Sequence, residues 1–106
     1  MATIGNFKKV GNTFQGDIMT LNLQATGVRL LPEENKPNDQ APDYRIFVGR
    51  AEIGAAWKKT SASMRDYISF KLDDPSFTAP MFASLFADDD GDTFSLIWSR
   101  PNRAND

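Results

Sequence analysis

The residues most suggestive of chemistry are the acidic run at positions 88–92, Asp-Asp-Asp-Gly-Asp. Its first, third and fifth residues have the spacing of the first ligands in an EF-hand calcium loop. The rest of that loop is missing, because Thr93 stands where it needs glycine and Ser99 where it needs glutamate. Since Asp-Gly is typical of tight chain reversals, the run predicts a hairpin turn rather than a metal site.

Two other pairs of residues could be taken for catalytic groups. Asp73 and Asp74 are adjacent, and neighbouring strand residues point to opposite faces, so the two carboxylates cannot flank one bond. Asp74 precedes Pro75, which instead predicts a turn that the carboxylate caps. Lys59 and Ser61 have the spacing of a Ser-Lys dyad, but no motif supplies an oxyanion hole.

The chain contains no histidine and no cysteine. It therefore lacks an imidazole base, a thiol nucleophile and the usual ligands of zinc or iron. We expect no metal, no cofactor and no catalytic residue, and hence a protein that is not an enzyme. A small hydrolase built on carboxylates is the least favoured of three functions considered.

A second kind of candidate is a binding surface made of aromatic and basic side chains. Tyr67 and Lys71 alternate with apolar neighbours, so both are expected on the outer face of a strand. Lys58 and Arg45 are the nearest basic residues of matching parity. Trp57 belongs to the same region, but the alternation of its strand predicts a place in the core. The predicted binding residues are therefore Tyr67, Lys71, Lys58 and Arg45, and together they could stack on bases and neutralise phosphates.

These side chains must be positioned by a small all-β domain. Short segments with period-two alternation are separated by turn residues throughout the chain. The pattern predicts a single-domain antiparallel barrel or sandwich of seven to eight short strands, spanning residues 1–100, with a flexible polar tail at 101–106. The expected strands cover residues 4–10, 13–23, 26–31, 44–48, 51–59, 66–72, 80–87 and 93–99.

Several local features refine this expectation. Gly16 interrupts the second strand and predicts a β-bulge there. Residues 32–43 contain three prolines and predict a long loop. Residues 80–87 fit both helical and strand spacing, and the strong turn that follows favours a strand. Phe70 and Trp98 lie on apolar faces and are expected in the core.

The charge balance restricts the partners of the protein. Its formal net charge is −2, so the chain is not a basic domain of the kind that binds nucleic acid unspecifically. Basic residues are concentrated at 43–71 and acidic ones at 73–92, and this segregation need not survive folding. The N-terminal residues lack the pattern of a secretory signal, and no apolar run could span a bilayer. We therefore expect a complete cytoplasmic protein.

Five segments of the chain resemble a bacterial family known as domain of unknown function 736. They are Met-Ala-Thr-Ile-Gly at 1–5, Ala-Pro-Asp-Tyr-Arg at 41–45, Glu-Ile-Gly-Ala-Ala-Trp-Lys-Lys-Thr at 52–60, Lys-Leu-Asp-Asp-Pro-Ser-Phe at 71–77 and Ser-Leu-Ile-Trp-Ser-Arg at 95–100. Arg50 departs from the small residue that many members carry. The resemblance implies no activity. It implies a mobile-DNA context, since such proteins tend to be encoded on plasmids and integrative elements.

Together these observations favour a non-enzymatic binding module that is an accessory protein of mobile DNA. The expected partner is another protein, because the chain is acidic and a small β-sheet has edges that a partner strand can extend. One version of this role is an inhibitor of host defence machinery. The alternative is a barrel that binds single-stranded nucleic acid.

Overall fold

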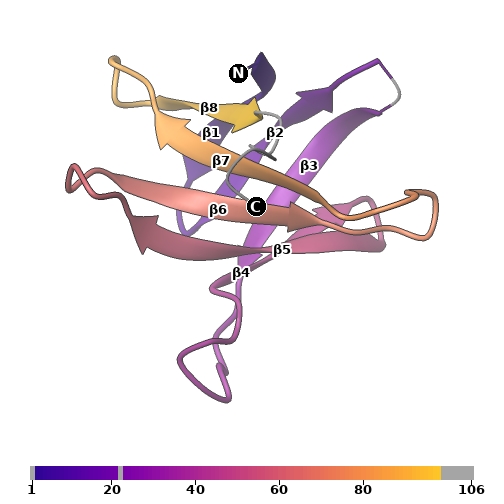
Figure 1. Cartoon of the computed structure of the whole chain (residues 1–106), viewed down its shortest axis with the longest axis horizontal. Coiled ribbons are helices and arrows are strands. Elements are labelled where there is room, and N and C mark those ends of the chain that lie inside the picture. The colour runs from indigo at the N-terminus through magenta and orange to yellow at the C-terminus, as the bar shows by residue number, and fades with distance from the viewer. Residues whose placement is uncertain (1, 22, 99–106) are drawn as a thin grey trace, which may run out of the picture.

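The structure is a computed structural model that describes residues 2–21 and 23–98 (Figure 1). The described part contains eight β-strands and no helix. Each strand pairs antiparallel with the next along the chain, and the first pairs with the last, so the sheet closes into a barrel. The strands are β1 (Ala2–Val10), β2 (Thr13–Met19), β3 (Gln24–Pro32), β4 (Tyr44–Val48), β5 (Ala51–Thr60), β6 (Asp66–Leu72), β7 (Met81–Ala87) and β8 (Thr93–Trp98).

The closed sheet confirms the all-β class and identifies the fold as a barrel rather than a sandwich. Residues 81–87 form β7, which pairs with β6 on one side and β8 on the other. The strand interpretation of this ambiguous segment is therefore confirmed. The predicted tail at 101–106 lies outside the described residues.

Apolar side chains that alternate along the strands fill the barrel. In β6, Ile68, Phe70 and Leu72 are buried, while the residues between them face outward. Phe70 is fully buried, as expected, whereas Trp98 is partly buried and packs against the edge of the core. The interior of an eight-stranded barrel is just wide enough for side chains to fill it. The largest fully buried residues are Phe7, Phe70, Ile18, Leu30, Ile46, Leu72, Leu85, Leu96 and Val28.

A β-bulge in β5 reverses the predicted orientation of Trp57. Ile46 of β4 pairs with Gly54 and the next residue of β4 pairs with Glu52, so Ile53 is an extra residue on β5. A bulge shifts the in–out alternation by one residue. Ile53 is buried, but beyond it Ala56 is the next buried position and Trp57 faces outward. The prediction that Trp57 lies in the core is therefore wrong.

The bulge predicted at Gly16 is also misplaced. The register between β2 and β3 does shift near Gly16, but the extra residue lies on β3, where Gly27 has a φ of 67°. Gly16 has a different role, because a Cβ at this position would collide with the backbone of Asn6 and with Phe7 on β1. Glycine there lets the two strands approach each other across the Phe7 side chain.

The long loop predicted at 32–43 connects β3 to β4 and extends below the barrel in Figure 1. Its two ends are joined by a hydrogen bond of 2.9 Å from the Glu33 backbone N–H to the Asp43 carbonyl. The Asp43 N–H donates in turn to the carbonyl of Ala56, also at 2.9 Å. The loop is therefore attached to the part of β5 that extends past the end of β4.

No helix long and apolar enough to cross a membrane occurs in the described part of the chain.

Candidate functional site

Tyr67 and Lys71 lie on the outer face of β6, as their alternation predicted. Their register partners on β5 are Lys59 and Ala55, and Lys71 also pairs with Phe82 on β7. Residues that pair directly across strands point to the same face of a sheet. Lys59 and Phe82 therefore share the outer face with the two predicted residues, and the Phe82 side chain is notably open, at 58% exposure.

Further aromatic and basic groups lie beside Tyr67. Its ring stacks on Phe86 of β7, with centroids 5.3 Å apart and an interplanar angle of 26°. The guanidinium carbon of Arg65 lies 4.7 Å from the Phe86 centroid, and its Nη2 donates to the Ala87 carbonyl at 2.9 Å. Stacking and cation–π contact thus hold three side chains in one fixed arrangement.

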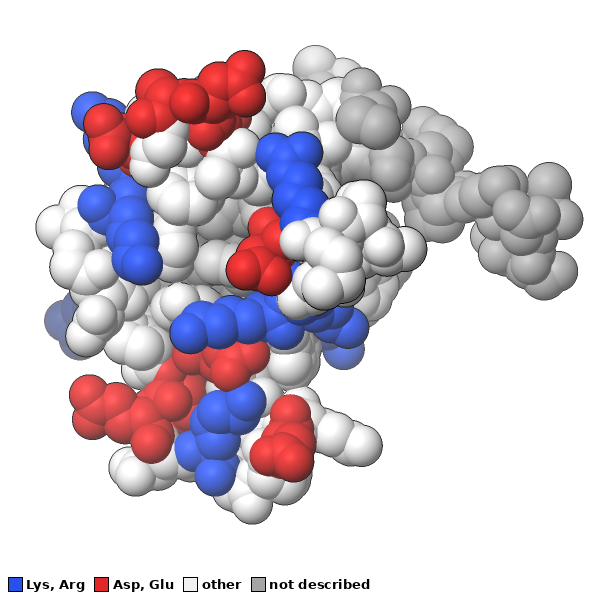
Figure 2. Space-filling model, turned by 90° about the vertical axis from the view of Figure 1, so that its left-hand side faces the viewer, with Lys and Arg blue, Asp and Glu red and all other residues white. Residues whose placement is uncertain are grey.

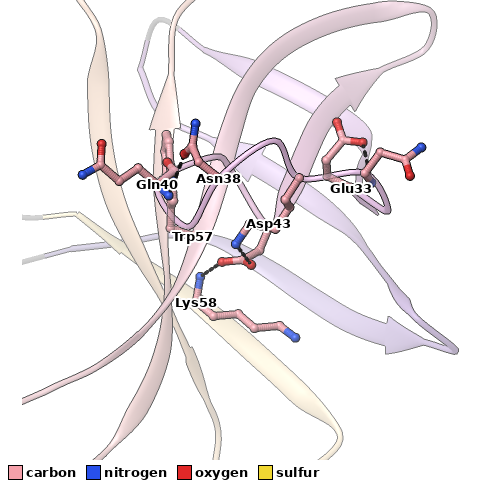
Figure 3. Close-up of polar contacts among 8 residues, drawn as sticks. Glu33, Asn38, Gln40, Asp43, Trp57 and Lys58 are labelled. Atoms are coloured by element: carbon pink, nitrogen blue, oxygen red, sulfur yellow. Dashed lines mark hydrogen bonds and ion pairs between the residues drawn. The ribbon is translucent and has the colours of Figure 1, made fainter.

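Trp57 joins this surface because of the bulge in β5. It pairs with Ser69 of β6, and its indole Nε1–H donates a 3.0 Å hydrogen bond to the carbonyl of Gln40 in the β3–β4 loop (Figure 3). Between the loop and the sheet lies a groove of about 640 Å³. The groove is lined by Trp57, Lys58, Lys59, Ser69, Lys71 and Phe82 of the sheet and by residues of the loop.

We call this surface the aromatic–basic face. Its members are the aromatic and basic side chains that point outward from β5, β6 and β7 beyond the bulge, together with one residue of the β5–β6 turn: Trp57, Lys59, Arg65, Tyr67, Lys71, Phe82 and Phe86. No carboxylate occupies an outward position at 55–59, 67–71 or 82–86, all of which the structure describes. Lys59 and Lys71 form no ion pair with any described residue.

Lys58 lies elsewhere. Its register partner is the buried Ile68, so the side chain points toward the inside of the barrel at its open end. Its Nζ lies 5.7 Å from the ring centroid of Tyr44, a buried residue of β4. Lys58 therefore does not share the outer face of the sheet, where the bulge makes Lys59 the outward lysine. It still lies near both predicted residues, because it lines the groove with Lys71 and a cavity at the barrel end with Tyr67.

Arg45 does lie on the outer face, in the same row as Ala55 and Lys71, but its charge is already balanced. Its Nε is 2.6 Å from a carboxylate oxygen of Glu33, and its Nη1 is 3.6 Å from one of Glu52. An arginine held between two carboxylates contributes less to an anion site than a lysine with no ion-pair partner.

Five members of the aromatic–basic face were missed by the sequence prediction, namely Trp57, Lys59, Arg65, Phe82 and Phe86. For Phe82 and Phe86 a signal existed, because the alternation in 81–87 places them opposite the buried Ala83 and Leu85. For Trp57 and Lys59 the in–out alternation of the strand, counted without a bulge, predicted the inner face. The only sign of the bulge in the sequence is a glycine inside the strand, Gly54. The structure shows that a Cβ at this position would collide with the backbone carbonyl of Lys71.

The β3–β4 loop is held against β5 by the carboxylate of Asp43. This carboxylate accepts from Lys36 Nζ at 2.7 Å and from the backbone N–H of Lys58 at 2.8 Å (Figure 3). The hydrogen bond from Lys36, followed by that from Lys58, holds the pKa of Asp43 below its ordinary value of 3.8, although partial burial opposes the shift. The charged form of Asp43 is thus part of the folded structure.

The acidic motifs that suggested chemistry have structural partners. Asp90 accepts from the backbone N–H groups of Asp92 and Thr93 at 2.9 and 3.0 Å, and these hydrogen bonds lower its pKa. Asp74 accepts from the N–H and hydroxyl of Ser76, as in the predicted turn. In the described residues, no three acidic side chains are grouped so that they could hold a metal ion.

Charge is unevenly distributed at the end of the barrel shown in Figure 2. Acidic side chains gather at the top, over the β7–β8 turn, and at the bottom, over the β3–β4 loop. Basic side chains lie between these groups, around a hollowed centre beside which acidic atoms are also visible. The segregation seen in the sequence therefore survives folding, in part, as a basic middle zone.

Comparison with known proteins gives a family and no further relative. A family model described as Protein of unknown function (DUF736) matches residues 3–101. The match confirms the resemblance noted in the sequence. No curated protein and no solved structure matches the chain.

Proposed function

The chain belongs to the DUF736 family, and from that premise we propose that it is a non-enzymatic binding module whose aromatic–basic face docks onto another protein. One observation carries the proposal: seven aromatic and basic side chains share one outer surface of β5–β7, with no carboxylate at an outward strand position there. Tryptophan, tyrosine and arginine are the residues enriched at the energetic centres of protein interfaces.

The chemistry of the face specifies the partner. Lys59 and Lys71 carry positive charges that no described carboxylate balances, and Phe82 exposes 58% of its surface beside Lys71. A complementary segment presents carboxylates next to an apolar side chain. The groove beside Trp57 has room for such a segment, with Ser69 at its floor. We therefore propose an acidic, partly apolar protein segment as the ligand.

Two features favour protein over single-stranded nucleic acid. The rings of Tyr67 and Phe86 are stacked on each other and Arg65 covers Phe86, so fewer ring faces are available to bases. A nucleic-acid strand carries a phosphate on every nucleotide and would bring some of them against Asp39 and Asp43, which border the groove. A protein segment can place its carboxylates opposite Lys59 and Lys71 alone. Nucleic acid is retained as the second candidate because exposed aromatics beside lysines also suit base stacking.

The mode of docking differs from the one expected from sequence. In a closed barrel every described strand has a neighbour on both sides, so no strand offers a full-length edge to a partner. Recognition then depends on side chains of the face. The context implied by the family resemblance, an accessory role in mobile DNA that includes inhibition of host defence machinery, is proposed as the setting of this interaction.

The test is a pull-down from the native cell with nuclease treatment and two matched double variants. Phe82→Ala with Lys71→Glu alters the face, whereas Leu21→Ala with Lys8→Glu makes the same changes at an exposed leucine and a β1 lysine outside the face. We expect a protein that is retained after nuclease, lost with the first variant and kept by the second. Retention by both variants would contradict docking on this face.

The nucleic-acid alternative has its own measurement. Fluorescence anisotropy can measure binding of a mixed-sequence single strand. Low salt is chosen because it screens the attraction between lysines and phosphates least. We expect little binding. Strand binding that weakens roughly tenfold in Phe82→Ala would match the loss of one stacked base. That result would favour nucleic acid over a protein as the partner.

A further inference from the structure

The open end of the barrel contains a second cavity, which adjoins the groove beside Trp57. It measures about 570 Å³ and is surrounded by the β1–β2, β3–β4, β5–β6 and β7–β8 connections. This volume lies within the range of about 300–1,000 Å³ typical of small-molecule sites. Lys58 and Lys59 line both the cavity and the groove, whereas Ser69, Lys71 and Phe82 line the groove alone.

The floor of this cavity is aromatic and aliphatic. Phe14 meets Tyr44 edge to face with centroids 5.7 Å apart, and meets Phe94 in the same way at 5.0 Å. Ile68 and Leu85, both buried, complete the floor. A surface of this kind takes an apolar body such as a hydrocarbon chain or a ring.

The rim of the cavity is basic. Lys9 Nζ lies 5.9 Å from the Phe14 centroid and Lys58 Nζ lies 5.7 Å from the Tyr44 centroid, so two ammonium groups stand over the aromatic floor. Lys59 lines the rim as well, and Asp66 supplies one negative charge against these three positive ones. Figure 2 shows basic side chains around the hollowed centre of this end.

None of the three lysines forms an ion pair with a described residue. The nearby carboxylate of Asp43 is occupied by Lys36 and by the backbone N–H of Lys58.

The hydroxyl of Tyr44 adds a polar group. The residue is 7% exposed and lines the cavity, yet its hydroxyl makes no hydrogen bond with a described residue. No fully buried side-chain oxygen in the described part lacks a partner. The hydroxyl must therefore reach solvent, and it is available to a ligand in the cavity.

We infer that this cavity, the barrel mouth, binds a small amphipathic anion, namely an organic carboxylate with an apolar body. The carboxylate lies between the ammonium groups of Lys9 and Lys58, within reach of the Tyr44 hydroxyl. The apolar body rests on Phe94, Leu85 and Ile68. Charge-assisted hydrogen bonds in such a setting are stronger than neutral ones. Lys59 and Tyr67 of the aromatic–basic face lie at the edge of this cavity, whereas the residues assigned to the anion, Lys9, Lys58 and Tyr44, do not belong to that face.

The alternative for the same residues is structural. Lysine stems can shield apolar surface at the end of a core while their charges remain in water. That role predicts no preference for an anion over a neutral molecule of equal length. The two roles therefore predict different ratios between the affinity for an anion and the affinity for a neutral molecule of equal length.

The probe is decanoate, compared with decan-1-ol, in an NMR titration of the full chain that follows Tyr44, Leu85 and Phe94. We expect decanoate to shift these signals and to bind about tenfold more tightly than the alcohol. One charge-assisted hydrogen bond changes a binding affinity by about that factor. Absence of shifts at millimolar decanoate, or equal affinity for the two probes, overturns the inference.

Variants test the basic rim without disturbing the core. Lys9→Met with Lys58→Met removes two charges and keeps the aliphatic stems, and should weaken decanoate binding by about tenfold or more while leaving decan-1-ol unchanged. Lys71→Met, outside the cavity, is the matched control and should bind decanoate as the wild type does. Unchanged decanoate affinity in the double variant contradicts the site.

The face variant Phe82→Ala with Lys71→Glu separates the two proposals. It should lose the protein partner and keep decanoate binding. Loss of decanoate binding in this variant would place the anion on the outer face and overturn the barrel-mouth site.

Discussion

Trp57 and Lys58 are neighbours in the chain, yet their side chains lie on opposite sides of the barrel wall. Trp57 contacts the β3–β4 loop on the outside, whereas the Lys58 ammonium stands over Tyr44 at the barrel mouth. A single extra residue in β5, Ile53, determines which of these two side chains points inward. The chemical role of each residue therefore depends on a backbone irregularity several positions away.

The positions of buried and outward side chains predict how much each truncation lowers the stability of the protein. Phe70→Ala removes a fully buried ring and should lower the free energy of unfolding by about 3–5 kcal/mol. Trp57→Ala removes a half-buried outer side chain and one hydrogen bond, and should cost about 1–2 kcal/mol. Urea unfolding measures both.

Trp57→Phe is the matched control, because it keeps an aromatic ring and loses the indole N–H. It should recover part of the stability and part of the partner affinity. A cost for Trp57→Ala as large as that for Phe70→Ala would mean that Trp57 belongs to the core after all.

At the scale of elements, the β3–β4 loop forms one wall of the groove. Three contacts attach it to β5: the Asp43 N–H to Ala56, the Asp43 carboxylate to the N–H of Lys58, and the Trp57 indole to Gln40. Two of them depend on one residue, Asp43. The shape of the groove is therefore linked to the charge of that carboxylate.

The loop contacts should consequently depend on pH. The folded protein holds the pKa of Asp43 below 3.8, mainly through the hydrogen bond from Lys36. A lowered pKa means that the stabilisation is present above the unfolded pKa and is lost as pH falls through the folded one. We expect the indole N–H signal of Trp57 to keep its position down to about pH 4 and to move below it.

Asp43→Asn is the control for this titration. Its stability should be lower than that of the wild type at neutral pH, and the difference should narrow as the pH falls below about 4. A constant difference across that range would show that the charge of Asp43 does not hold the loop.

At the scale of the whole molecule, closure of the barrel determines which surfaces remain for recognition. Pairing of β1 with β8 gives the first and last strands neighbours on both sides. The described strands therefore leave no full-length edge for the edge-strand docking expected from sequence, and the docking that we propose uses a side-chain face instead. The same closure creates a defined end, the barrel mouth, which an open sheet would not have.

Hydrogen exchange can test closure directly. Amides in the paired stretches of β1 and β8 should be as strongly protected as those of β5 and β6, because all are bonded on both sides. In an open sheet β1 and β8 would be edges and would exchange much faster. Fast exchange confined to these two strands would contradict the closed barrel and restore edge pairing as a docking mode.

The local structure could be predicted from residues that are neighbours in the chain. Period-two alternation marks β6 and β8, and proline and glycine mark the long loop and the turns. All eight expected strands occur, although the second ends at Met19 rather than at residue 23 and the third begins at Gln24 rather than at residue 26. Tyr67 and Lys71 were placed correctly on an outer face because β6 has no bulge and its alternation is regular. Such signals are carried by neighbouring residues, so the sequence alone contains them.

The pairing of the strands and the position of the extra residue depend on contacts between distant parts of the chain. The pairing of β1 with β8 joins segments nearly the length of the chain apart, and no local pattern encodes it. The bulge at Ile53 depends on how β4 and β6 register against β5, and it turns Trp57 and Lys59 outward. Hydrogen-bond ladders and core packing between distant strands fix these choices, and they assemble both the aromatic–basic face and the barrel mouth.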